Sequence, residues 1–394
     1  SNERAFAALK SDGSITAWGN ADSGGSGAPS DSGYTQVFSN NSAFAALKPD
    51  GSITAWGNAD RGGSGAPEDS GYTQVFSNPG AFAALKSDGS ITAWGYGGNG
   101  GSGAPSDNGY TKVFSTGFAF AGLKADGSIK VWGNADAGGS GAPSDRGYTK
   151  VFSTGYAFAG LKSDGSIKVW GDSSWGGSGA PSDSGYTQVF STVSAFAALK
   201  SDGYIKAWGE SSRGGSGAPS DSGYTQVFSN GYAFVGLKAD GSITAWGDGE
   251  DSGLGAPSDS GYTQVFSNPG AFAALKSDGS ITAWGYGGNG GSGAPSDNGY
   301  TKVFSTGFAF AGLKADGSIK VWGNADAGGS GAPSDRGYTK VFSTGYAFAG
   351  LKSDGSIKVW GDSSWGGSGA PSDSGYTQVF STVSAFAALK SDGY

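Results

Sequence analysis

The chain contains no cysteine, no histidine and no methionine in its 394 residues. Without cysteine it can form neither disulfide bonds nor thiolate metal sites. Without histidine it lacks the commonest general base and the commonest metal ligand. The sequence also has no apolar run long enough to span a bilayer, so we expect no membrane insertion. We therefore expect no catalytic residue, no cofactor and no metal ion, and we predict that the protein is not an enzyme.

Basic residues are also in short supply. Lysine and arginine number 25 against 33 aspartate and glutamate, which gives a net charge of −8. The basic residues are spread along the chain and form no cluster. Because neutralising a phosphate backbone needs clustered cations, we expect no nucleic-acid partner.

What the chain does contain is one unit repeated without insertion or deletion. The dipeptide Asp-Gly recurs at Asp12-Gly13, at Asp50-Gly51 and so on to Asp392-Gly393, in steps of 38 residues (50 − 12). A fixed period of this length indicates one supersecondary unit stacked on copies of itself. Glycine is abundant, at 77 residues, but it stands at a fixed phase beside aromatic and aliphatic residues, which argues against disorder.

Each unit reads as three short strands. In the first unit, residues 5–10 and 15–19 are apolar runs on either side of an Asp-Gly turn, and residues 34–39 form a third run after a Gly/Ser-rich loop. A two-residue turn at Asp-Gly predicts a hairpin in which Lys10 is opposite Ile15 and Ala7 is opposite Trp18. Both faces of this hairpin are largely apolar, so we expect it to lie between neighbouring units.

One tryptophan occupies the same phase in every complete unit. It could be an inter-unit core residue or a platform for stacking sugars. Small alanine neighbours and a constant phase favour the core. These residues are Trp18, Trp56, Trp94, Trp132, Trp170, Trp208, Trp246, Trp284, Trp322 and Trp360.

Two motifs resemble a known family. Residues 160–171 read Gly-Leu-Lys-Ser-Asp-Gly-Ser-Ile-Lys-Val-Trp-Gly, and residues 185–191 read Gly-Tyr-Thr-Gln-Val-Phe-Ser. Together they resemble the repeats of the regulator-of-chromosome-condensation superfamily, and the short unit looks closest to the bacterial β-lactamase-inhibitor branch. The resemblance covers the whole chain, unit by unit. It implies a β-propeller of small blades whose loops, with aromatic residues in them, grip a protein partner.

The number of units sets the predicted architecture. Ten complete units and a partial one exceed the 4–8 blades usual for a propeller. We therefore predict an all-β fold of tandem 38-residue three-stranded repeats, with propeller-like blades stacked as an open superhelical array; the alternative is a closed β-propeller. Residues 1–394 are expected to be one continuous array and an excerpt of a longer protein. Residues 69–204 are identical to residues 259–394, which indicates a duplicated block of five units.

Variation between units points to the candidate binding residues. The hairpin barely changes along the chain, whereas the four residues after each Trp-Gly and the segment before the first strand differ freely. Variable loops on a rigid framework are where binding surfaces arise, although unselected solvent-exposed loops would look the same. The candidate residues are Asp22, Arg61, Tyr96, Asn99, Asp172, Trp175, Glu210, Arg213, Asp248, Asp251, Tyr286 and Trp365.

Two hypotheses for function follow. The first is a secreted or cell-surface structural protein that forms a fibre, stalk or adhesive array and assembles end to end or laterally with itself. The absence of oxidation-prone cysteine and methionine fits an extracellular location. The second is a closed β-propeller that acts as a binding module, a lectin or a protein inhibitor, and grips a protein or glycan through the loops after Trp-Gly.

Overall fold

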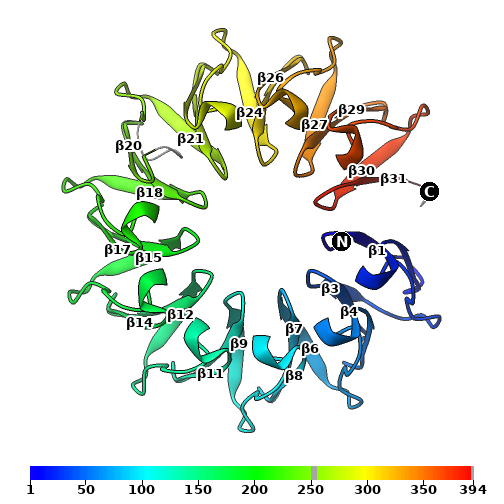
Figure 1. The fold of residues 1–394 in the computed structure, drawn as a ribbon, viewed down its shortest axis with the longest axis vertical. Helices are drawn as coiled ribbons and strands as arrows, with labels where there is room; N and C mark the ends of the chain where they lie inside the picture. Colours follow the sequence, from blue (N-terminus) through cyan, green and yellow to red (C-terminus); the bar gives the residue numbers. More distant parts are fainter. Residues whose placement is uncertain (250–254, 392–394) are drawn as a thin grey trace. The chain divides into compact units, whose positions relative to one another are not determined.

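A computed structural model describes residues 1–249 and 255–391 of the chain (Figure 1). The chain divides into two compact units. Unit 1 comprises residues 1–198 and 208–210, and unit 2 comprises residues 199–207 and 211–394.

The described residues contain thirty-one strands and nine short helical turns. The strands are β1 Ala5–Leu9, β2 Ile15–Gly19, β3 Gln36–Ser39, β4 Ala43–Leu47, β5 Ile53–Gly57, β6 Tyr72–Asn78, β7 Ala81–Lys86, β8 Ile91–Gly95, β9 Tyr110–Ser115, β10 Ala119–Lys124, β11 Ile129–Gly133, β12 Tyr148–Ser153, β13 Ala157–Lys162, β14 Ile167–Gly171, β15 Tyr186–Ser191, β16 Ala195–Lys200, β17 Ile205–Gly209, β18 Tyr224–Ser229, β19 Ala233–Lys238, β20 Ile243–Gly247, β21 Tyr262–Asn268, β22 Ala271–Lys276, β23 Ile281–Gly285, β24 Tyr300–Ser305, β25 Ala309–Lys314, β26 Ile319–Gly323, β27 Tyr338–Ser343, β28 Ala347–Lys352, β29 Ile357–Gly361, β30 Tyr376–Ser381 and β31 Phe386–Lys390. The helical turns are η1 Ala21–Ser23, η2 Ala59–Arg61, η3 Gly97–Asn99, η4 Ala135–Ala137, η5 Ser173–Trp175, η6 Ser211–Arg213, η7 Gly287–Asn289, η8 Ala325–Gly329 and η9 Ser363–Trp365.

These strands form small sheets that follow one another along the chain. Among the described residues, nine sheets have three strands, such as β9–β10–β11, and β1–β2 and β30–β31 have two. The third strand of each sequence repeat pairs with the hairpin of the next repeat, as β3 does with β4. The prediction of an all-β chain of tandem three-stranded units is confirmed; the choice between an open array and a closed propeller stays a prediction.

The predicted hairpin register is wrong by one residue. Leu9 pairs with Ile15 and Phe6 with Trp18, so the loop at Asp-Gly has five residues rather than two. In this loop Gly13 N donates to Lys10 O at 2.9 Å and the Asp12 carboxylate accepts from Ser14 N at 2.8 Å. Only Gly13 has a positive φ, whereas a type I′ turn needs two such residues. Phenylalanine and tryptophan therefore share one face of the sheet.

Every complete sheet has a face of large side chains and a face of small ones. In unit 1, Phe120 and Trp132 of the sheet β9–β10–β11 pack with Tyr110 against alanines and aliphatic residues of the preceding sheet, among them Ala83. The opposite face of the same sheet, which includes Ala121, packs against the large residues of the following sheet. Because large side chains meet small ones, sheets of one sequence can stack repeatedly without leaving gaps.

A glycine of the preceding repeat caps the aromatic pair at most interfaces; the exceptions are Trp170 and Trp284, whose Nε1 atoms have no hydrogen-bond partner among the described residues. Phe120 and Trp132 stack with ring centroids 5.3 Å apart, and Trp132 Nε1 donates to Gly100 O at 3.0 Å. Gly100 ends η3 with a φ of +90°, and a Cβ on it would lie 2.7 Å from Phe120 Cδ2. A glycine is needed here both for its backbone conformation and for the close approach of the ring.

Two further contacts hold successive sheets together. Tyr110 N donates to Gly89 O at 3.1 Å, which ties the Asp-Gly turn of one sheet to the first strand of the next. Ser115 Oγ donates to Ser77 O at 3.1 Å, and Ser153 Oγ donates to Ser115 O at 2.8 Å. Both kinds of contact recur at intervals of 38 residues, so each sheet is fixed to its neighbour at the turn and along the strand.

The close approach at Gly100 can be tested with a pair of glycine substitutions. Gly109 has a φ of +87°, similar to that of Gly100, but a Cβ on it would meet nothing within 4 Å. Both Gly→Ala changes carry the backbone cost of about 1–2 kcal/mol. We expect Gly100→Ala to lower the free energy of unfolding by a further 1–3 kcal/mol or so, because the methyl group overpacks Phe120. Equal losses in denaturant titrations of the two variants would contradict this contact.

Tryptophan burial between sheets gives a second prediction. Trp132 is 3% exposed, whereas Trp18, whose face has no preceding sheet among the described residues, is 41% exposed. We expect Trp132→Ala to lower the free energy of opening its sheet by about 3–5 kcal/mol, and Trp18→Ala to have a much smaller effect. Native-state hydrogen exchange of β10 and β1 amides measures both; comparable losses would show that the burial of Trp132 contributes little.

Candidate partner-binding surface

The loops of each sheet lie at its two opposite ends, where the strands begin and finish, and the two ends differ in character. At one end, called here the turn edge, the Asp-Gly hairpin joins the second and third strands, as residues 125–128 do between β10 and β11. At the other, called here the helix edge, a helical turn follows the third strand, and a short segment joins the first and second strands. In the sheet β9–β10–β11 these parts of the helix edge are η4 and residues 116–118.

The structure places all the described candidate binding residues at the helix edge. They occupy the N-cap, the second or the third position of a helical turn, or the position after the third strand where the turn would begin. These residues are Asp22, Arg61, Tyr96, Asn99, Asp172, Trp175, Glu210, Arg213, Asp248, Tyr286 and Trp365. Asp251, the remaining candidate, lies outside the described residues.

The residue before most helical turns holds the turn in place. Asn134 Oδ1 accepts from Asp136 N at 2.9 Å, and Asp172 Oδ1 accepts from Ser174 N at 2.8 Å. Asparagine and aspartate suit this position because a short side-chain oxygen reaches the free backbone N–H groups of the first turn. Tyr96 stands at the same position without a side-chain cap, so the turn also forms without this bond. The expected Gly/Ser-rich loop thus begins with a short ordered helical turn.

Exposure separates the candidate residues. The Tyr96 and Tyr286 side chains are 53% and 54% exposed. In contrast, Asn99 is 3% exposed, and its Nδ2 donates to Gly117 O at 3.3 Å. The structure therefore places Tyr96 and Tyr286 on the surface and Asn99 within the packing between repeats.

Three aromatic side chains from neighbouring repeats form a row at the helix edge of unit 1. The Phe118 and Tyr156 ring centroids are 4.9 Å apart, and those of Tyr156 and Trp175 are 4.4 Å apart. All three are half-buried, and Val193 beside them is 41% exposed. A Cβ on Gly155 would lie 3.1 Å from Trp175 Cζ3, so glycine lets the indole lie close to the backbone. We call Phe118, Tyr156 and Trp175 the aromatic row.

Unit 2 has its own aromatic row with the same geometry. The Phe308 and Tyr346 centroids are 4.8 Å apart, and those of Tyr346 and Trp365 are 4.5 Å apart. Sequence reasoning identified Trp175 and Trp365 but missed their ring partners. The available signal was a Gly-aromatic pair in the variable segment before the strand, at residues 117–118 and 155–156.

Cations lie over two other aromatic rings of the helix edge. Arg61 Cζ is 5.8 Å from the centroid of the Tyr96 ring, and Arg213 Cζ is 4.1 Å from that of Tyr232. Such a position is favourable because the face of an aromatic ring carries partial negative charge. At the helix edge, arginine and tyrosine of different repeats thus pair with one another.

A cluster of polar groups recurs at the turn edge. Tyr110 Oη donates to Asp107 Oδ1 at 2.7 Å, and Lys124 Nζ lies 2.6 Å from Asp107 Oδ2 and 4.8 Å from the centroid of the Tyr110 ring. The hydrogen bond from Lys124 lowers the pKa of the Asp107 carboxyl, and burial raises the pKa of the Tyr110 phenol. The same arrangement holds the first strand of nearly every sheet, which indicates a structural role.

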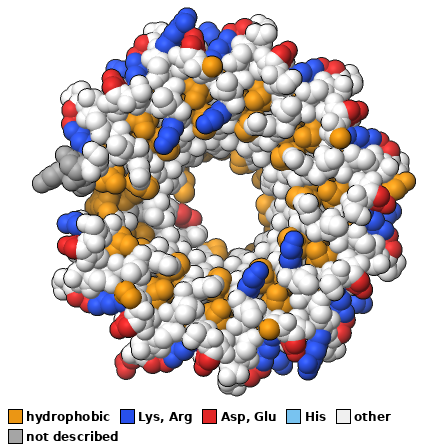
Figure 2. All heavy atoms as spheres, turned by 180° about the vertical axis from the view of Figure 1, so that it is seen from behind, with side chains coloured by type: hydrophobic (Ala, Val, Ile, Leu, Met, Phe, Trp, Pro, Cys, Tyr) orange, Lys and Arg blue, Asp and Glu red, His pale blue; other side chains and the backbone are white. Residues whose placement is uncertain are grey.

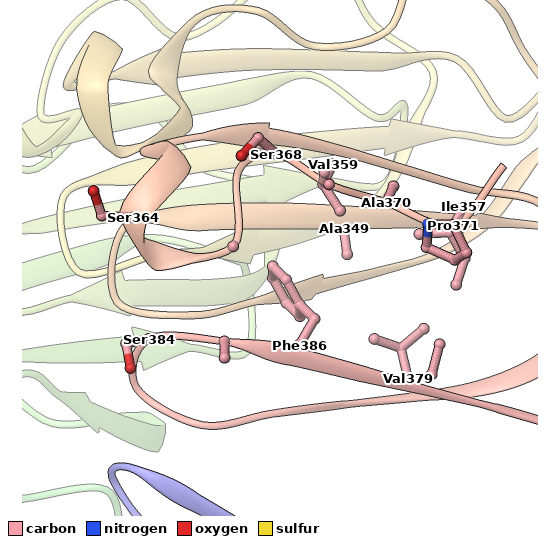
Figure 3. Close-up of a pocket in the computed structure, with 14 residues that line it drawn as sticks. Ala349, Ile357, Val359, Ser364, Ser368, Ala370, Pro371, Val379, Ser384 and Phe386 are labelled. Carbon is pink, nitrogen blue, oxygen red and sulfur yellow. The ribbon is translucent and has the colours of Figure 1, made fainter. Parts of the chain in front are cut away.

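A hollow of about 310 Å³ lies between the sheet β27–β28–β29 and the sheet β30–β31 (Figure 3). Its lining includes Gly366 and Phe386. At the preceding interface the corresponding place holds the Trp360 indole, which stacks on Phe348 and donates to Gly328 O at 3.2 Å. Among the described residues, no second ring stacks on Phe386. The hollow therefore corresponds to the position that the Trp360 indole occupies at the preceding interface.

The part of the chain that the structure describes offers neither a metal-binding cluster nor a membrane-spanning helix. There, no three histidine, cysteine, aspartate or glutamate side chains are grouped so that they could hold a metal ion. No described helix has the length and apolar character to cross a membrane. On the face drawn in Figure 2, basic and acidic side chains of the described residues are interspersed.

Of three comparisons with known proteins, only the one with solved structures found matches. No family model matches it, and no curated protein matches it. The ectodomain of the Physcomitrella patens receptor kinase CR4 is 19% identical over 68% of this chain and 73% of that chain, with a TM-score of 0.39. The CRINKLY WD40 ectodomain of the Arabidopsis thaliana receptor kinase ACR4 is 20% identical over 67% of this chain and 98% of that chain, with a TM-score of 0.35.

A third similar structure belongs to the superfamily that the repeats resemble. Prp20p of Saccharomyces cerevisiae, which is yeast RCC1, is 14% identical over 67% of this chain and 75% of that chain, with a TM-score of 0.35. RCC1 is thus among the solved structures that this chain resembles, as its motifs predicted, while the likeness to the bacterial inhibitor branch stays a prediction. At these identities and TM-scores the three structures carry no argument about function.

The turn-edge clusters give a prediction for acid stability. The pKa values of Asp31, Asp69, Asp107 and Asp145 are lowered in the folded chain, chiefly by hydrogen bonds from lysine. A carboxyl with a lowered pKa stabilises the fold above its unfolded pKa of about 3.9, and this stability is lost as the pH falls through the folded pKa. We expect the midpoint of thermal unfolding to decrease as the pH is lowered from about 5 to about 2. Asp→Asn changes at these four sites should make this dependence of the midpoint on pH less steep. An unchanged slope in the variant would assign acid sensitivity to other groups.

Proposed function

We propose that the protein is an extracellular repeat scaffold that binds a protein or glycan partner through its helix edge. The proposal rests on one observation. Most contacts that hold the repeats together recur in successive repeats, whereas the exposed residues of the helix edge vary among repeats.

The constant contacts occupy the faces, the turn edge and the strands. The tryptophan-to-glycine hydrogen bond recurs in both units, as from Trp94 to Gly62 and from Trp322 to Gly290. In every described helical turn the glycine at its C-terminal end is kept while the residues before it change. The framework tolerates loss of the hydrogen bond itself, since Trp170 Nε1 has no partner among the described residues. A surface that varies on a fixed framework suits recognition.

Binding is also favoured over catalysis. The helix edge combines exposed aromatic rings with asparagine, serine and glycine, a composition that suits contact surfaces. Aspartates at this edge such as Asp172 use an oxygen to cap a helical turn. We therefore propose that the activity of the protein is recognition.

A structural role is the second candidate. The hydrogen bonds at 38-residue intervals, such as Ser77 Oγ to Ser39 O, would extend an array of any length. This supports a fibre, stalk or adhesive array that assembles with itself. The candidates differ in what they require of the helix edge: recognition depends on its particular residues, and a structural array does not.

The proposed recognition is tested by making the helix edge uniform. Residues 134–137, Asn-Ala-Asp-Ala, form a capped turn with a buried third residue, so they can replace the equivalent four residues of every repeat without loss of the framework. We expect the uniform variant to keep its unfolding midpoint and to lose binding to a panel of purified glycans and displayed peptides that the parent protein binds. A matched variant altered only at the exposed turn residue Tyr204 should keep that binding.

The two outcomes separate the candidates. If the uniform variant binds every ligand as the parent does, recognition through the helix edge is wrong. If negative-stain images then show that both proteins form the same filaments, the structural role is favoured instead.

A further inference from the structure

The aromatic rows differ from the other aromatic residues of the helix edge in their surroundings. The Tyr96 and Tyr232 rings each have an arginine of this chain over one face. Among the described residues, no lysine or arginine lies over the rings of Phe118, Tyr156 or Trp175. The aromatic row thus offers rings of the kind that pair with arginine guanidinium groups elsewhere at the helix edge of this chain.

The geometry of the row suits a flat or compact cation. The Tyr156 and Trp175 rings meet at 54° rather than lying parallel, and Phe118 is tilted by 33° to Tyr156. Because the three rings are in contact and only half-buried, the exposed side of the row presents several rings to one small group, and a cation bound there is attracted to their π-systems. Hydrogen bonds fix the backbone that carries the row: Gly155 N donates to Val193 O at 2.9 Å, and Thr154 Oγ1 donates to Trp175 O at 2.9 Å.

The charges beside the row have one sign. The helix-edge segments around it, residues 116–118, 134–141, 154–156, 172–179 and 192–194, contain two charged residues, Asp136 and Asp172, and no lysine or arginine. Asp136 is exposed and Asp172 is partly exposed. Together with a net charge of −8, these carboxylates favour the approach of a cation and disfavour that of an anion.

We propose that each aromatic row is a binding site for a cationic group, the guanidinium or ammonium of an arginine or lysine side chain presented by a partner protein. This rests on the proposed function, since it names the chemistry recognised at the helix edge. The site occurs twice, at Phe118, Tyr156 and Trp175 in unit 1 and at Phe308, Tyr346 and Trp365 in unit 2. A partner that presents two such side chains gains by avidity wherever its spacing allows both to bind.

The test uses small probes on the whole chain. Biosynthetic incorporation of 5-fluorotryptophan gives fluorine NMR signals for the tryptophans, and those of Trp175 and Trp365 are assigned by their loss in the double variant Trp175→Phe, Trp365→Phe. We expect acetyl-arginine amide to shift these signals in the parent protein. Its neutral counterpart, acetyl-citrulline amide, should bind at least about twofold more weakly, because it has the same shape without the charge.

Two matched variants separate the contributions. Asp172→Asn with Asp362→Asn removes a carboxylate beside each row but keeps the cap, since asparagine caps the equivalent turn at Asn134. We expect this variant to bind the arginine probe more weakly with an unchanged unfolding midpoint. Tyr204→Ser removes an exposed aromatic ring at the turn edge, where most repeats have serine, and should leave the probe shifts as they are.

Other outcomes overturn the proposal in distinguishable ways. Equal shifts with the arginine and citrulline probes would show that charge is not recognised. Shifts with methyl glucoside but not with the arginine probe would make the row a sugar platform. If the uniform helix-edge variant loses its ligands while the arginine probe shifts nothing in the parent, the proposed function stands and the cation site is wrong.

Discussion

The stacking of repeats depends on the contact between a glycine and an aromatic pair. Gly100 lies close enough to Phe120 that even a methyl group would collide with the ring, and its carbonyl accepts the indole hydrogen of Trp132. This one contact buries two large rings, satisfies the one polar atom of the indole and fixes the end of the helical turn. Because it joins adjacent repeats, no repeat attains the buried state of its aromatic face alone.

This arrangement separates framework from surface within a single repeat. The apolar faces of the inner sheets are buried against neighbouring sheets, and at the turn edge charged groups form pairs, as Asp107 does with Lys124. The helix edge is bound to the framework through its backbone and through the glycine that ends each turn. Its side chains are free to vary, so the chain can place an arginine, a tyrosine or a tryptophan there without loss of stacking.

The aromatic row illustrates how such variation produces a local environment. Phe118 and Tyr156 are one repeat apart in sequence and come together because successive sheets stack in register. Trp175 joins them from the helical turn that follows the sheet of Tyr156. The identical row in unit 2 follows from the identity of residues 69–204 and 259–394, so the protein carries this feature twice.

The sequence by itself determined the class of the fold, the repeat length, the three strands of each repeat and the buried position of the recurrent tryptophan, because strand periodicity and turn residues are local signals. It could not determine the hairpin register. The choice between a two-residue and a five-residue turn depends on the hydrogen bond that Ser14 N donates to the Asp12 carboxylate and on the stacking of Phe6 with Trp18. It also identified Trp175 as a surface candidate without its ring partners. Only the tertiary structure decided which side chains meet at the helix edge, because those contacts join segments that approach one another only when the sheets stack.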